Sequence, residues 1–193
     1  MTVSAINAAH TSQGTFRALM DAFAFPGEIK TIRGAKAPAP LAPATAAILL
    51  CLADFETPVW LDPTLNLAEV TDWIRFHTGA PLIEARNRAA FAVIGNSRNP
   101  PAFAEFALGS DEYPDRSTTL IFQLDRFAGR SFQVRGPGIK GTRIFAAEPL
   151  PDDFAARLAF NRELYPRGVD VILVAGEQAE VLPRSVHVTT GGH

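Results

Sequence analysis

The stretch RFHTGAP, residues 75–81, combines a side chain that binds anions with one that exchanges protons. The guanidinium of Arg75 matches carboxylate and phosph(on)ate groups, and the imidazole of His77 changes its charge near neutral pH. The same stretch can end a helix, because Gly79 tolerates the left-handed conformation and Pro81 prevents helix continuation. Two interpretations follow: a helix end with His77 at the negative pole of the helix dipole, or an Arg75–His77 pair that contacts a ligand or a partner subunit.

A second polar stretch, GSDEYPDRSTTL (109–120), leads from acidic residues through Arg116 and three hydroxyl residues into an apolar strand. Loops at strand ends are where α/β proteins place binding groups. The alternative interpretation is a solvated turn before a strand that begins with residues of high β-propensity.

The sequence does not contain the residue patterns of a metal site, a phosphate-binding loop or a reactive cysteine. No cysteine or histidine recurs at metal-ligand spacing, so we expect no protein-bound metal. The stretch RGPGIKGT (135–142) has the glycines of a phosphate-binding loop, but Lys140 is wrongly spaced and Pro137 removes a backbone donor; a Pro-Gly turn is expected. The single cysteine, Cys51, lies in an apolar run and is expected to be a buried, unreactive thiol.

Helical patterns surround these stretches. Apolar residues at positions 16, 19, 20 and 23 have helical spacing, with Ser12 as a candidate N-cap and Phe-Pro-Gly at 25–27 as the stop. Pro43 is well placed as the first residue of a helix that runs to about Ala53. Asn66, with Glu69 three residues later, suggests a capping box for a helix over 67–77. Two more helices are expected over 101–109 and 151–164.

Strand patterns alternate with these helices, which predicts an α/β protein with a mixed sheet. The strands are expected within residues 27–34, 57–62, 89–95, 117–124, 131–138, 169–176 and 179–185. Nearly continuous apolar runs such as VDVILVA indicate a sheet that is covered on both faces. We find no repeat or linker, so residues 1–193 are expected to form one domain with a core over about 12–188.

The composition is that of an ordinary globular protein, with 47% hydrophobic and 20% charged residues among 193. A net charge of −2 and a pI near 6.1 give no field that attracts nucleic acid or an anionic membrane. Without signal-peptide features or a membrane-length apolar run, a cytoplasmic location is expected. The 15 arginines against three lysines have two explanations: codon preference, or recognition of carboxylate and phosph(on)ate groups.

Several segments together resemble a known family. FRALMDAFAFPGEI, CLADFETPVWL, IRFHTGAPL, GSDEYPDRSTTLI, GPGI, YPRGVDVILVAGE and LPRSVHV occur in the order and with roughly the spacing of the PhnH family. PhnH is the H subunit of the bacterial carbon–phosphorus lyase machinery. The resemblance extends from about Phe16 to Val188, nearly the whole chain.

The resemblance implies a fold similar to that of the pyridoxal-phosphate-dependent transferases, a mixed sheet flanked by helices, in a homodimer without the cofactor. A pyridoxal Schiff base needs a lysine on a site loop. Lys30 lies in an expected strand, Lys36 in a Pro-Ala loop and Lys140 beside a turn, so none has suitable surroundings. We therefore expect no cofactor, and a retained pyridoxal-phosphate site is the least favoured hypothesis.

The family's role implies an accessory subunit without activity of its own. PhnH-like proteins work with the G, I and J subunits, and with the L protein, in ribose 1-methylphosphonate 5-triphosphate synthesis. In that step, the ribose triphosphate moiety of ATP is transferred to an alkylphosphonate. The later radical cleavage belongs to the iron–sulfur cluster of J, whose cysteine ligands this chain lacks.

The family's recurrent pattern corresponds here to ten residues, which we expect to line a cleft or a subunit interface rather than to catalyse. They are Asp54, Thr57, Trp60, Arg75, His77, Thr78, Arg116, Ser117, Thr118 and Arg184. The alternative is an independent transferase in which Arg75 and Arg116 clamp a phosphonate or nucleotide and His77 acts as acid or base.

Overall fold

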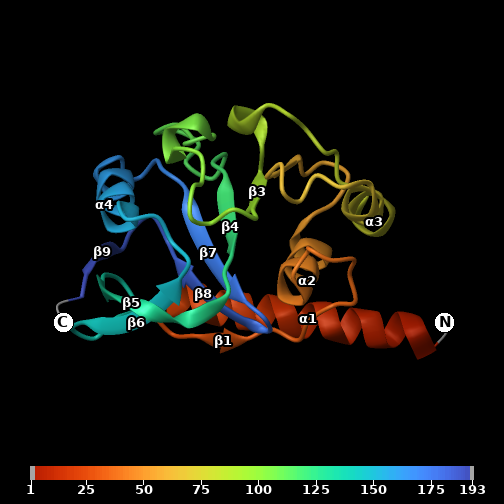
Figure 1. The fold of residues 1–193 in the computed structure, drawn as a ribbon, viewed down its shortest axis with the longest axis horizontal. Coiled ribbons are helices and arrows are strands. Elements are labelled where there is room, and N and C mark those ends of the chain that lie inside the picture. Colours follow the sequence, from red (N-terminus) through yellow and green to blue (C-terminus); the bar gives the residue numbers. More distant parts are fainter. Residues whose placement is uncertain (1–2, 192–193) are drawn as a thin grey trace.

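The computed structural model describes residues 3–191, and a six-stranded mixed sheet lies at their centre (Figure 1). Four neighbouring strands run parallel, and two further strands extend the sheet in antiparallel fashion. In spatial order they are β1 (Lys30–Thr31), β8 (Gln178–Leu182), β7 (Asp170–Ala175), β4 (Thr119–Gln123), β3 (Phe91–Ile94) and β2 (Val59–Leu61).

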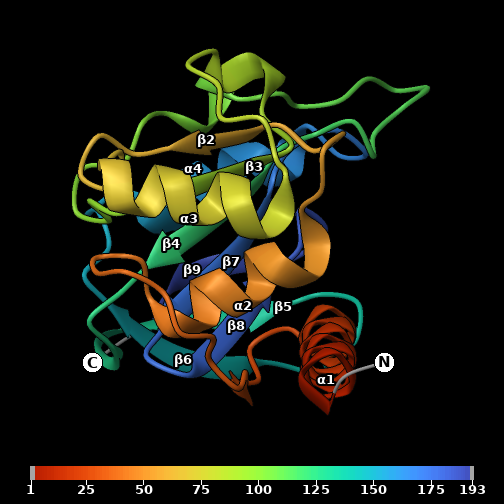
Figure 2. The same cartoon turned by 90° about the vertical axis from the view of Figure 1, so that its right-hand side faces the viewer.

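Three helices cover one face of this sheet. They are α1 (Val3–Ala24), α2 (Pro43–Leu52) and α3 (Ala68–Thr78), of which α2 and α3 lie in front of the strands in Figure 2. Leu19 of α1, Ile48 of α2 and Ile74 of α3 are fully buried in one apolar cluster with side chains from the strands. Burial of these apolar faces drives the three helices onto the sheet.

The opposite face packs against α4 (Phe154–Glu163) and a second sheet of three antiparallel strands. Its order is β6 (Arg143–Glu148), β5 (Arg126–Arg135) and β9 (His187–Thr190). Three phenylalanines join the layers edge to face: the ring of Phe154 lies 5.9 Å from Phe122 of β4 and 5.7 Å from Phe132 of β5. Such contacts stabilise beyond the area that they bury.

The apolar side chains of β7 are buried on both faces of the large sheet. Ile172 and Val174 point into the cluster under α1–α3, whereas Val171 and Leu173 point into the cluster under α4 and the second sheet. Because successive side chains of a strand point to opposite faces, an uninterrupted apolar run is buried on both sides. The prediction of a mixed sheet covered on both faces is confirmed.

The expected start of one helix is confirmed, whereas two expected helix caps and one expected helix are wrong. Pro43 begins α2. Ser12 is not an N-cap, because α1 begins at Val3 and Ser12 lies in its interior. Asn66 is not the cap of α3, whose N-cap is Leu67 without a side-chain bond. Residues 101–109 form only a 3-10 turn at Phe103–Glu105.

The second sheet was only partly foreseen. The sequence predicted β5, but not β6 or β9, which pair with it on either side. The apolar stripe of α1 is also only half buried: Leu19 is inaccessible, whereas Phe16 and Met20 remain exposed. None of the helices in residues 3–191 is both long and apolar enough to cross a membrane.

Candidate functional site

The sequence-predicted site residues gather at one edge of the large sheet. Since β2, β3, β4 and β7 are parallel, their first residues lie together; we call this the amino edge. Thr57 precedes β2, Thr118 precedes β4, and Arg184 follows β8 beside the start of β7. Helix α3 also ends here, because Gly79 lies close to Phe55 of the segment before β2. This is the edge opposite the one where α/β proteins usually bind ligands.

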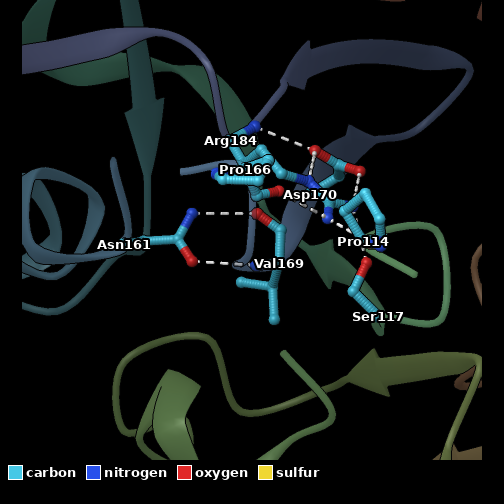
Figure 3. Close-up of polar contacts among 7 residues, drawn as sticks. All are labelled: Pro114, Ser117, Asn161, Pro166, Val169, Asp170 and Arg184. Atoms are coloured by element: carbon cyan, nitrogen blue, oxygen red, sulfur yellow. Dashed lines mark hydrogen bonds and ion pairs between the residues drawn. The ribbon is translucent and has the colours of Figure 1, made fainter. Parts of the chain in front are cut away.

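Arg184 is the most heavily bonded side chain of this edge (Figure 3). Its guanidinium contacts both carboxylate oxygens of Asp170, with Nε at 3.2 Å from Oδ1 and Nη2 at 2.6 Å from Oδ2. Nη1 donates to the carbonyl of Pro114 at 2.6 Å, and Nη2 to Oγ of Ser117 at 2.5 Å. The Arg184 and Asp170 side chains are only 14% and 17% exposed. Arg184 therefore links the 114–117 loop to β7, and its guanidinium donors form hydrogen bonds to acceptors of the same chain.

Two neighbouring groups complete the internal network. Thr118 is fully buried; its hydroxyl donates to the carbonyl of Ala89 at 2.6 Å and accepts from the N–H of Ala107 at 3.1 Å. The amide of Asn161 on α4 bonds both backbone groups of Val169, just before β7, at 2.8 and 2.9 Å (Figure 3). These bonds satisfy backbone groups that the strand starts would otherwise leave unpaired.

The ADFETPVW segment forms a turn and a buried strand start. The Thr57 hydroxyl donates to Oδ1 of Asp54 at 2.6 Å, and the N–H of Glu56 donates to the same oxygen at 2.9 Å. These two donors hold the pKa of Asp54 below its usual value, because they stabilise the carboxylate. Trp60 is buried against Phe106, with ring centroids 5.6 Å apart.

The RFHTGAP stretch is a helix end whose Arg75 and His77 side chains face solvent. Thr78 donates to the carbonyl of Ile74 at 2.7 Å and accepts from the N–H of Ala80 at 3.0 Å, and Gly79 takes a left-handed φ of 72°. Arg75 and His77 are exposed. The helix-end interpretation is confirmed, and it leaves Arg75 and His77 free to contact a ligand or a partner.

Aromatic side chains surround His77. Its ring lies 4.6 Å from that of Trp73 and 5.0 Å from that of Phe76. Phe76 is 86% exposed, and Phe55, which packs beside Gly79, is 74% exposed. We call Phe55, Trp73, Phe76 and His77 the aromatic end of α3. Large apolar side chains this exposed are a feature of interaction surfaces.

Arg75 and Arg116 line different hollows. Arg75 borders one of about 370 Å³ beside β2, whereas Arg116 borders one of about 250 Å³ next to Ser117 and Arg88. The Arg116 guanidinium also stacks over Tyr113, 4.2 Å from the ring centroid. The structure thus does not bring Arg75 and Arg116 together as one clamp.

The groups that would hold a cofactor or metal are dispersed. Nζ of Lys30 is 2.5 Å from Glu28, and Lys36 and Lys140 are exposed; no lysine borders the hollow of Arg75 or that of Arg116. Among the described residues, no group of three or more His, Cys, Asp or Glu side chains is placed to hold a metal ion. Cys51 is half-buried, and burial raises the pKa of its thiol.

Sequence reasoning missed two residues of this region. Asp170 is the main partner of Arg184, and pairing the expected strands at 169–176 and 179–185 as a hairpin would have placed the two together. Arg86 was also missed; it lies in a 3-10 turn, with its guanidinium 5.0 Å from the centroid of Trp60. No local pattern marks Arg86, because its neighbours come from distant segments.

Fold and site define an α/β protein whose amino edge is held by internal hydrogen bonds and exposes aromatic and arginine side chains. The chain belongs to the PhnH family: residues 5–189 match the family described as bacterial phosphonate metabolism protein (PhnH). The family resemblance found in the sequence is thereby confirmed.

Two curated relatives agree with this assignment. The chain is 44% identical over 176 residues to the alpha-D-ribose 1-methylphosphonate 5-triphosphate synthase subunit PhnH of Rhizobium meliloti (strain 1021), covering 90% of this chain and 88% of that protein. It is 31% identical over 184 residues to the putative C-P lyase subunit protein HtxG of Stutzerimonas stutzeri, covering 93% and 87%.

Proposed function

We propose that this protein is an accessory subunit of a carbon–phosphorus lyase complex in phosphonate catabolism. In this role it supports transfer of the ribose triphosphate moiety of ATP to an alkylphosphonate, without turnover of its own. The observation that carries the proposal is membership in a family whose two similar relatives both bear the word subunit in their names. The expected partners are the G, I and J subunits, and the L protein in the same step.

The geometry of the amino edge supports an assembly role over an independent transferase. The motif residues with the most hydrogen bonds, Thr118 and Arg184, are bonded to the chain itself. Exposed motif residues lie apart: Arg75 and His77 are on α3, beside the exposed rings of Phe55 and Phe76, whereas Arg116 borders another hollow. A transferase needs its clamping and acid–base groups around one reacting centre. A subunit instead needs exposed aromatic anchors, which the aromatic end of α3 supplies.

The finer structural expectations belong to the same proposal. We propose one domain with a fold related to the pyridoxal-phosphate-dependent transferases, assembled as a homodimer in the cytoplasm. Phe16 and Met20 lie four residues apart on α1 and are both exposed, which supports self-association through this helix.

The test is co-purification of the tagged chain with the G, I and J subunits. Wild type is expected to retain all three, and native mass spectrometry of the complex gives the copy number of each. Phe76→Asp is expected to reduce retention by tenfold or more, because loss of an interface anchor costs about 2 kcal/mol or more. The midpoint of its thermal unfolding should fall only slightly, since Phe76 is almost fully exposed, and by about as much as that of Phe160→Asp, because both substitutions put a carboxylate in the last turn of a helix.

Phe160→Asp is the matched control, because Phe160 is an exposed phenylalanine of α4, on the other side of the sheet. It is expected to co-purify normally. If Phe160→Asp loses the subunits and Phe76→Asp retains them, the interface lies at α4 and not at α3. Failure of the wild-type chain to retain any of the three subunits would refute the assembly role.

A further inference from the structure

A hollow of about 370 Å³ lies beside β2, the last strand of the large sheet. Its walls come from β2, from α3 and from residues 82–86, which pass alongside the strand. The volume is within the range of small-molecule sites in proteins. None of the residues in the internal network of the amino edge borders this hollow.

Arg86 and Arg75 border the hollow. Nη1 of Arg86 donates to Glu105 at 2.5 Å, whereas Nε is buried without a hydrogen-bond partner, and Nη2 donates to no residue that the structure describes. Arg75 has only an exposed ion pair with Asp72, at 3.7 Å. Exposed pairs of this kind contribute little. Nη2 of Arg86 and the guanidinium of Arg75 therefore have donors to spare, whereas the buried Nε of Arg86 is closed to a ligand.

Two neutral groups add further donors. The N–H of Asp62, the residue after β2, donates to Val93 of β3, whereas the N–H of Val59 in β2 donates outward to Pro81. By the alternation of a parallel strand, the N–H of Leu61 also points outward, and no described residue accepts it. Leu61 and Asn66 both border the hollow, and the Asn66 amide forms no hydrogen bond with the described residues. An unpaired strand N–H is a strong donor with a fixed direction.

The balance of charge and polarity defines the ligand. Arg75 and Arg86 give two positive charges, and Glu84 on the same hollow gives one negative charge. Leu82 and Ile83 supply an apolar wall. Donors from β2, from α3 and from the 82–86 segment suit an oxyanion with three oxygens better than a carboxylate with two.

We propose that this hollow binds the phosphonate or phosphate group of a small organic molecule, between Arg75 and Arg86. Trp60 holds the Arg86 guanidinium in place, 5.0 Å from its ring centroid, so that the charge is ordered before the ligand arrives. The phosphonate class rests on the proposed function, whereas anion binding rests on the donors. The smaller hollow, of about 250 Å³ at Arg88 and Arg116, is the competing location.

Calorimetric titration of the pure full-length chain tests the proposal, with methylphosphonate, inorganic phosphate and acetate as separate probes at low salt. Methylphosphonate and phosphate are expected to bind at least tenfold more tightly than acetate. Arg75→Gln and Arg86→Gln should each weaken binding about tenfold or more, as expected for loss of a hydrogen bond between charged groups. Glu84→Gln should strengthen binding, because it removes the one repulsive charge of the hollow.

Arg88→Gln is the matched control: it is the same substitution on the same 3-10 turn, but on the smaller hollow. Its affinity should equal that of wild type. Loss of binding with Arg88→Gln but not with Arg86→Gln would overturn the proposed location. Equal affinity for acetate would overturn the ligand class, and no heat with any probe up to about 10 mM would overturn the site itself. Co-purification of Arg86→Gln with the other subunits separates the two proposals, since it should persist when anion binding is lost.

Discussion

At the scale of single residues, the motif side chains of the amino edge divide into two groups. Six form hydrogen bonds within the chain, although Asp54 is also exposed: Asp54, Thr57, Thr78, Ser117, Thr118 and Arg184. Those that face solvent are Arg75, His77 and Arg116. The first group fixes the geometry, and the second is available to ligands and partners. Substitutions in the two groups should therefore have different consequences.

Arg184→Met should destabilise the protein strongly. It removes the cation that neutralises Asp170 and the donors that hold Pro114 and Ser117, so a largely buried carboxylate is left without its main partner. Breaking a fully buried ion pair costs about 3–5 kcal/mol, and the slight exposure of this pair lowers our expectation to about 2–4 kcal/mol. Chemical denaturation measures the loss, and limited proteolysis should show faster cleavage in the 113–117 loop.

Arg167→Met supplies the comparison for Arg184→Met. Arg167 pairs with Asp111 at 3.4 Å, but both side chains are well exposed. Its replacement should change the free energy of unfolding by less than about 0.5 kcal/mol, as usual for surface pairs. Equal losses in the free energy of unfolding for the two substitutions would mean that the Arg184–Asp170 pair does not stabilise the amino edge.

At the scale of elements, a glycine that follows a helix and a glycine inside a helix should respond in opposite directions to substitution by alanine. Gly79 ends α3 with φ of 72°, and a Cβ there would meet only Phe55 at an ordinary 3.7 Å. Gly79→Ala should therefore cost about 1–2 kcal/mol from backbone strain alone. Gly14 lies inside α1 with nothing within 4 Å of an added Cβ, so Gly14→Ala should stabilise by about 0.5–1 kcal/mol. Thermal unfolding measures both, and a neutral Gly79→Ala would contradict the strain argument.

The elements that the sequence predicted well are those with a local physical signal. Adjacent residues alone are enough to predict the buried strand β7 from its apolar run, the start of α2 from its proline and the end of α3 from its glycine. The errors fall where the cause is tertiary. Ser12 has the chemistry of an N-cap but lies within α1, and β9 buries only Val188 of its four residues, which is too weak an alternation to identify alone.

The candidate site was also predictable only in part: the sequence indicated which residues lie there, but not what they contact. The family pattern marked residues that do gather at the amino edge, but their roles depend on partners far away in the sequence. Thr118 bonds Ala89, and Arg184 bonds Pro114, which are 29 and 70 residues away along the chain. Arg86 becomes a candidate only because Trp60 and Glu105 lie beside it in the folded chain. Spacing along the chain carries no information on such contacts.

At the scale of the whole molecule, the large sheet is covered by helices on one face and by α4 with the second sheet on the other. An ionisable side chain without a hydrogen-bond partner lies within this packing. Glu180 of β8 is fully buried opposite Leu173, and neither carboxylate oxygen has a hydrogen-bond partner among the described residues. Burial raises the pKa of Glu180 well above its usual value, and the positive charge of Arg143 opposes this only in part. Arg143 is itself bonded to Glu28 and to the carbonyl of Pro26.

The raised pKa of Glu180 should make the stability of the whole fold depend on pH. The folded state keeps the proton that the unfolded chain releases near pH 4.3, so this contribution is fully present below that pH and is lost as pH rises towards the folded-state pKa. Glu180→Met removes both the titration and an unpaired polar group, and it should stabilise by about 1–3 kcal/mol at pH 8 but less at pH 5. Denaturation curves at the two pH values measure the difference. Glu163→Met, at an exposed position of α4, should leave the pH profile unchanged; parallel profiles for wild type and Glu180→Met would mean that burial of this carboxyl costs the fold nothing.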